Sequence, residues 1–209
     1  MEEEVRRCAY CGKGGETTRE HVVPRCFYPE SKATSRVQRI TVPACRPCND
    51  GWADDEAHAK HVLLLAGESN AAVQELWPSA LRAMTVAADA RRRLFDVVER
   101  LVPTTIDGQE RHVIYPDKDE RVMRVIRKIV RGSCAHHSVG TAIPDARVST
   151  NVLDPPPPPE LLNGIELHHV EQDIIEYWYD VSDEHPAIQS IWFLRFFERC
   201  DFVALVLAS

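Results

Sequence analysis

Several features that define other classes of protein are missing from this 209-residue sequence. It contains no run of about 18 apolar residues, which excludes a transmembrane helix. The chain starts Met1-Glu2-Glu3-Glu4, which is acidic where a secretory signal would be basic and then apolar, so we expect a cytoplasmic protein without membrane contact. No internal repeat occurs. The composition, 44% hydrophobic and 27% charged, is typical of a globular chain that buries a core.

An excess of positive charge is also missing, since the formal net charge is -7. This speaks against a nucleic-acid partner, because such proteins use Lys and Arg to displace phosphate counterions. The charge is uneven, however: residues 1–50 hold nine Lys and Arg against seven Asp and Glu, a net of +2, which leaves -9 for the rest. A phosphate-binding surface is therefore expected on the N-terminal part. Its candidate arginines are Arg6, Arg7, Arg19, Arg25, Arg36, Arg39 and Arg46.

Four of the seven cysteines form two Cys-x-x-Cys pairs, Cys8 with Cys11 and Cys45 with Cys48. In a reducing compartment this pattern indicates metal binding more than disulfides, and the odd total agrees. Two thiolates two residues apart can both reach one ion at about 2.3 Å, so the four cysteines predict one structural zinc. The alternative, four unliganded buried cysteines, does not explain the polar residues around them. The long separation leaves room for a functional loop held at both ends.

That loop contains Arg19-Glu20-His21-Val22-Val23-Pro24-Arg25, and Asn49 directly follows the second cysteine pair. Over about Cys8 to Lys60, the sequence resembles the HNH family of nucleases. Zinc-stapled members of that family have an acid-His-aliphatic-x-Pro motif between two cysteine pairs, and a His or Asn after the last cysteine. Five matching elements in one order are far more specific than any one of them.

The resemblance implies a ββα-metal fold, in which a first strand ends near Glu20-His21, a second strand covers residues 39–42 and a helix follows Asn49. It also implies that His21 is the general base that deprotonates a water, while Glu20 and Asn49 bind a catalytic Mg²⁺ or Mn²⁺. The expected function is a metal-dependent endonuclease that hydrolyses phosphodiester bonds in nucleic acid, with DNA as the expected partner. No protein partner can be inferred.

Elementary chemistry supports these roles. An imidazole with a pKa near 6.5 accepts a proton at neutral pH, and a hard cation prefers carboxylate and amide oxygens. If one helix continues from Asn49, Glu56 and Lys60 share its face. Glu56 is then a further candidate metal ligand, and Lys60 joins Arg19 and Arg25 as candidate contacts to nucleic acid. The alternative for both helix residues is a solvated charged face.

One family element is absent. The middle Asn on the second strand, which helps to orient the catalytic His, would fall around Gln38 to Thr41, most nearly at Ile40, and no Asn occurs there. A second interpretation therefore stays open: a catalytically weak or inactive zinc module that binds nucleic acid without cutting it. In that case His21 is a buried residue that orients its loop.

The rest of the chain predicts an α+β protein. We expect the HNH module over 1–67, a mainly helical region over 68–153, a proline spacer over 154–159 and a β-rich region over 160–209. The expected helices are 54–67, 70–100 with a break near Trp77 and Pro78, and 119–131 ended by Gly132. The expected strands are 165–170, 174–181, 191–197 and 202–207, the last two as a hairpin.

The helix expected over 119–131 has an apolar stripe and, opposite it, a basic run. This run consists of Arg124, Arg127, Lys128 and Arg131. The pattern predicts a solvated face, with an extension of the phosphate-binding track as the other interpretation.

Overall fold

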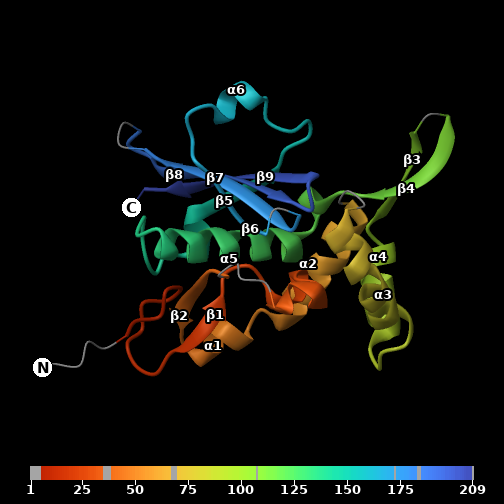
Figure 1. Ribbon diagram of the computed structural model, residues 1–209, viewed down its shortest axis with the longest axis horizontal. Coiled ribbons are helices and arrows are strands. Elements are labelled where there is room, and N and C mark those ends of the chain that lie inside the picture. The colour runs from red at the N-terminus through yellow and green to blue at the C-terminus, as the bar shows by residue number, and fades with distance from the viewer. Residues whose placement is uncertain are drawn as a thin grey trace, which may run out of the picture.

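The computed structural model describes residues 6–34, 39–66, 70–106, 108–171, 173–182 and 185–208. One helix, α5 (Glu120–His136), lies at the centre of the molecule. A five-stranded sheet covers one side of α5 and the N-terminal module lies on the other side (Figure 1). The expected α+β class is confirmed, with antiparallel sheets throughout the described chain.

The N-terminal module, residues 6–66, is built on an antiparallel hairpin of β1 (Thr18–His21) and β2 (Thr41–Ala44). The first strand ends at His21, as predicted. Two short 3₁₀ turns lie between the strands, η1 (Arg25–Phe27) and η2 (Glu30–Thr34).

Two helices follow the hairpin, α1 (Arg46–Asp50) and α2 (Ala53–Ala66). Asn49 and Glu56 therefore lie on separate helices, and the single continuous helix on which their shared face depends is absent. Gly51 caps α1, and a side chain there would meet the carbonyl oxygen of Pro47 at 2.9 Å. The glycine expected to end α2, Gly67, lies outside the described residues.

The next part of the chain forms two helices, α3 (Ala71–Thr85) and α4 (Ala90–Val98). The break predicted near Trp77 is wrong, since Pro78 lies inside α3. The buried residues Ala72, Val73, Leu76, Ala80 and Met84 form one stripe that runs past the proline. Pro78 itself is on the exposed side, where water can satisfy the carbonyl that loses its partner.

The region predicted to be mainly helical also contains strands. After α4, β3 (Leu101–Ile106) and β4 (Gln109–Ile114) form a hairpin that projects beside α3 and α4 (Figure 1). A 3₁₀ turn, η3 (Pro116–Lys118), then leads to α5. The Asp119 side chain caps α5, where it accepts a hydrogen bond from the Arg121 N–H at 3.0 Å.

Helix α5 continues past Gly132 to His136, so the predicted stop at Gly132 is wrong. Gly132 instead leaves room for the N-terminal module, because a Cβ there would lie 2.8 Å from Tyr10 Oη and 2.9 Å from Val22 Cγ2. The helix and the N-terminal module approach each other too closely at this point for any side chain.

The large sheet has the order β5-β9-β8-β7-β6, with every neighbouring pair antiparallel. The predicted hairpin of the last two strands is confirmed. The five strands of this sheet are β5 (Val148–Val152), β6 (Leu167–Glu171), β7 (Ile175–Val181), β8 (Ile188–Phe196) and β9 (Cys200–Leu207). The strand β5, which pairs with β9, lies before the proline run and was not predicted.

A 3₁₀ turn, η4 (Asp145–Arg147), precedes β5, and the short helix α6 (Pro159–Leu162) follows the prolines. Pro155 to Pro158 have no regular structure, while Pro159 is the first residue of α6, a position where a missing N–H costs nothing. Within the part of the chain that the structure describes, no helix is both long and apolar enough to cross a membrane.

Candidate functional site

One end of the β1–β2 hairpin carries the four cysteines of the two pairs. Their Sγ atoms all lie within 4.8 Å of one another, and Cys11 Sγ is 3.7 Å from Cys45 Sγ. Four sulfurs at about 2.3 Å from a tetrahedral ion would be about 3.8 Å apart. The tetrad, Cys8, Cys11, Cys45 and Cys48, is therefore close enough to bind a metal ion, as predicted. Among the described residues it is the one group of three or more such ligands that meets this condition.

Local backbone geometry shapes the first cysteine pair. Gly12 N–H donates to Cys8 O at 2.9 Å, and Gly12 takes the left-handed conformation with φ of 72°. Burial raises the pKa of Cys8, but hydrogen bonds with the backbone of Cys45, Cys11 and Tyr10 outweigh burial and lower it to about 7. In contrast, burial and the neighbouring sulfurs raise the pKa of Cys48. Four thiolates this close repel one another, so a cation is needed for all of them to ionise.

The other end of the hairpin carries Glu20, which is 6% exposed. Its carboxylate forms an ion pair with Lys128 of α5. The same Lys128 Nζ donates to Glu56 Oε1 of α2 at 2.7 Å and to the backbone oxygen of His21 at 2.9 Å. Burial raises the pKa of Glu20, although the Lys128 charge opposes that shift. Two of the three predicted ligands for a catalytic ion, Glu20 and Glu56, are thus brought together, but around an ammonium group.

The predicted solvated face of α5 is wrong for two of its four basic residues. Lys128 is 0% exposed and Arg131 is 8% exposed. Arg131 donates to Ile143 O at 2.6 Å and to Tyr10 O at 2.8 Å, so it joins α5 to the first cysteine pair. Sequence reasoning missed both residues because a basic run opposite an apolar stripe normally faces water. The signal that could have found them is the glycine beside them, which allows close packing.

His21 is the last residue of β1, and its side chain is half-buried. Burial, together with the positive charges of Arg25, Arg39 and Arg19, lowers the pKa of its imidazole below 6.5. The ring is therefore neutral at neutral pH. Its Nδ1 atom is buried and has no hydrogen-bond partner among the described residues.

Among the described residues around the place expected for the family's middle Asn, none pairs with that nitrogen. Thr41 lies opposite His21 in the hairpin, and the Ile40 backbone oxygen accepts from Val22 N–H at 3.1 Å. The Ile40 side chain packs against the core and offers no polar atom. Gln38, at the start of the range expected for the middle Asn, lies outside the described residues.

The predicted third ligand, Asn49, has another partner. Its Nδ2 donates to Thr18 Oγ1 at 2.7 Å, and Thr18 Oγ1 donates to the Ala44 backbone oxygen at 3.1 Å. Side chains alternate along a strand, so those of Thr18 and Glu20 leave β1 on one side and that of His21 on the other. The Glu20 carboxylate and the His21 imidazole therefore lie on two different sides of β1.

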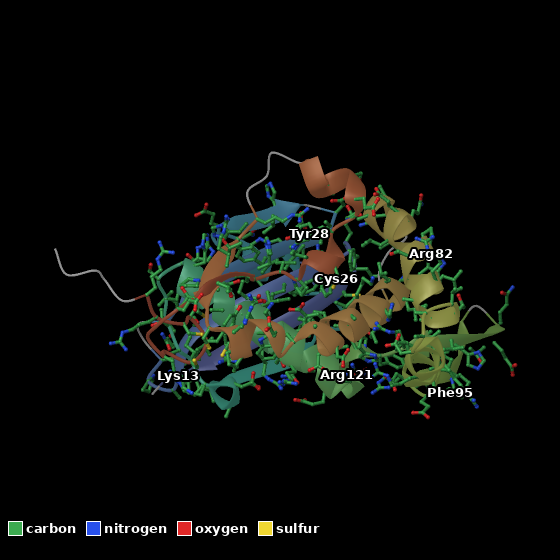
Figure 2. The ribbon with its side chains drawn as sticks, turned by 90° about the horizontal axis from the view of Figure 1, so that it is seen from below. Lys13, Cys26, Tyr28, Arg82, Phe95 and Arg121 are labelled. Atoms are coloured by element: carbon green, nitrogen blue, oxygen red, sulfur yellow. The ribbon has the colours of Figure 1, made fainter. Side chains whose placement is uncertain are left out.

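The residues predicted to contact nucleic acid differ in exposure and in their distance from His21. Arg19 and Arg25 are exposed and lie close enough to His21 to affect its pKa, and Arg39 stacks over the Tyr28 ring at 4.1 Å. Lys60 lies on α2 near Cys26, and burial lowers its pKa. Figure 2 shows Cys26 and Tyr28 on the segment that follows β1, beside α2. Arg19 and Arg25 can meet a phosphate beside His21, whereas Lys60 is half-buried. Arg36 lies outside the described residues.

Comparison with known proteins gives no match: no protein-family model, no curated protein and no solved structure is significantly similar to this chain.

Proposed function

We propose that this protein is an HNH-type endonuclease that hydrolyses phosphodiester bonds in nucleic acid, with DNA as substrate. The proposal is supported by the motif between the cysteine pairs and by a metal-binding cysteine tetrad at the base of a strand-strand-helix unit. We propose zinc as the ion of the tetrad, since four thiolates in this geometry are its typical ligands.

One observation carries the catalytic part of the proposal: a neutral imidazole stands among three arginines at the end of β1. His21 can take a proton from a water as the water oxygen attacks phosphorus; the bond between phosphorus and the leaving nucleotide oxygen breaks, and solvent returns a proton to that oxygen. The guanidinium groups of Arg19 and Arg25 can bind the phosphate oxygens and compensate the negative charge that builds on them. A low imidazole pKa keeps the base in its active form at neutral pH.

The resemblance also implies a catalytic Mg²⁺ or Mn²⁺ at Glu20, Asn49 and Glu56. These residues do not fit such an ion as they are packed, because both carboxylates are paired with Lys128 and Asn49 is bonded to Thr18. No step of the proposed reaction is assigned to that ion.

The test is cleavage of plasmid, single-stranded DNA and RNA by the purified protein, with and without Mg²⁺ or Mn²⁺. We expect His21→Ala to lower the cleavage rate by roughly 10² to 10⁴, the usual contribution of a general base. Zinc content and DNA affinity should stay the same, since no cysteine or arginine is removed. His169→Ala is the matched control, because His169 is exposed on β6, and its rate should equal that of the parent. A His21→Ala variant that cuts at the parent rate contradicts the assignment.

A second function is favoured by a specific observation, the pairing of Glu20 and Glu56 with Lys128. In this interpretation the module binds nucleic acid through its arginines and does not cut. The cleavage assay distinguishes the two functions. If the parent protein binds DNA in a salt-dependent manner but cuts no substrate with any divalent ion, it is a binding module.

A further inference from the structure

The most unusual charged group in the molecule is the ammonium of Lys128. Its side chain is 0% exposed and lies between three structural elements, α5, β1 and α2. An ammonium group has three N–H donors, and here they have three acceptors: the Glu20 carboxylate, Glu56 Oε1 at 2.7 Å and the His21 backbone oxygen at 2.9 Å. The hydrogen-bonding capacity of Lys128 is therefore fully used inside the protein.

The arrangement around Lys128 has the form of a cation site. Two carboxylates from different elements converge on one positive centre, and a backbone carbonyl supplies a third oxygen. These are the ligand types that a divalent ion prefers. A buried ammonium needs close negative partners, because the loss of hydration is otherwise uncompensated. An ion that entered between Glu20 and Glu56 would have to expel Lys128 from the two acidic groups with which it pairs among the described residues.

We propose that Lys128 supplies, from within the chain, the positive charge that a divalent ion would supply between Glu20 and Glu56, so that this carboxylate pair takes up no ion while Lys128 is present. Through its bond to the His21 backbone oxygen, Lys128 also acts as a positioning residue for the imidazole. The second statement rests on the proposed hydrolysis. The first rests on the ion pairs alone.

A neighbour on α5 provides the contrast. Arg127 is also basic and pairs with acids, but its partners are Glu120 of α5 and Asp145 of η4, at 2.8 Å for the latter, and neither belongs to β1, β2 or α2. Arg127→Met therefore removes a basic side chain from the same helix without touching Glu20, Glu56 or His21. It is the matched control for Lys128→Met.

The first experiment measures Mn²⁺ binding by electron paramagnetic resonance, which gives the concentration of free Mn²⁺. It uses the whole 209-residue chain with zinc retained in the tetrad. We expect the parent and Glu20→Gln to give the same titration, with no Mn²⁺ site that depends on Glu20. Lys128→Ala should gain one Mn²⁺ per chain, and Lys128→Ala with Glu20→Gln should lose it again.

Two outcomes would overturn the proposal. One is a parent protein that binds one Mn²⁺ per chain and loses it in Glu20→Gln, because the ion then displaces Lys128. The other is a folded Lys128→Ala variant without a new site. If Lys128→Ala does not fold, the comparison of parent with Glu20→Gln still decides, since uptake that depends on Glu20 refutes the exclusion of the ion.

The second experiment tests the positioning of His21. Lys128→Met fills the same space without the charge, and we expect kcat to fall roughly 10- to 100-fold, with KM within about twofold, because a displaced base costs rate more than binding. Arg127→Met should leave both unchanged. An equal loss in both variants, or a change in KM alone, would show a merely structural role. If the parent cuts nothing, the proposed function fails, but the Mn²⁺ titration still tests the carboxylate site.

Discussion

The N-terminal module and the five-stranded sheet pack on opposite sides of α5, and they are held there by different forces. On the sheet side the largest buried residues are apolar: Trp192, Phe196 and Phe202 are all 0% exposed. On the module side the contacts include a buried ammonium and a buried guanidinium, Lys128 and Arg131. The sheet is stabilised mainly by the area it removes from water, while the module also needs its charges matched.

This difference indicates which region should lose stability when a single group is removed. The module has few residues and a short hairpin, so its own core is small, and a bound metal contributes folding free energy. Loss of the metal or of one buried charge should therefore affect the module first. The sheet should respond less, because apolar burial does not depend on a single group.

The largest effect is expected from the cysteine tetrad. Cys45→Ser removes one of four ligands, so we expect loss of the bound metal and unfolding of residues 6–66, with the sheet retained. Metal content by mass spectrometry under native conditions and hydrogen exchange of the two regions would measure this. Cys26→Ser is the control, because Cys26 lies outside the tetrad and donates only to the Glu56 backbone oxygen at 3.7 Å. A metal-free variant with an unchanged hairpin would contradict the prediction.

A smaller effect is expected where the module touches α5. Gly132→Val places a branched side chain where even a Cβ lies 2.8 Å from Tyr10 Oη. Overpacking of this kind costs about 1 to 3 kcal/mol, so the free energy of unfolding should fall by that amount. Urea denaturation measures it. His136→Val introduces the same residue at an exposed position of α5 and should cost little, because His and Val have similar helix propensities. Equal losses would show that the close approach is unimportant.

The smallest effect is a dependence of stability on pH. His61 of α2 is 1% exposed, and burial, together with Lys60 and Arg93, lowers its pKa to about 4. Between about pH 6.5 and about pH 4 the unfolded chain binds a proton at this histidine and the folded chain does not, so the free energy of unfolding falls as the pH falls. We expect a loss of about 3 kcal/mol over this range.

His61→Leu should remove that part of the pH dependence, as measured by urea denaturation at pH 7 and pH 4.5. The comparison is with His137 on the sheet side of α5, whose pKa burial also lowers to about 4. Its ring is half-buried and its Nε2 is 2.9 Å from Tyr177 Oη, which can accept a hydrogen bond from the charged form, so His137→Gln should change the slope less. A larger effect at His137 would reverse the comparison.

Local sequence predicted many elements of both regions. The cysteine pairs and the four C-terminal strands follow from spacing and alternation, which depend on near neighbours alone. The strand ending at His21 and the helix after the second pair were expected from the resemblance to HNH nucleases. The helix break at Pro78 was predicted wrongly, because the buried stripe of α3 continues past the proline. The hairpin of β3 and β4 was missed, since it lies in a region rich in helix-forming residues.

The sequence by itself determined the metal-binding cysteines, the Glu20-His21 motif and the amphipathic character of α5, because each depends on residue types at fixed short spacing. Only the tertiary structure decided what those residues meet. The polar side of α5 is covered by the N-terminal module, so Lys128 reaches Glu20 from 108 positions away and takes the place expected for an ion. Such pairing depends on the packing of distant elements, and no local pattern encodes it.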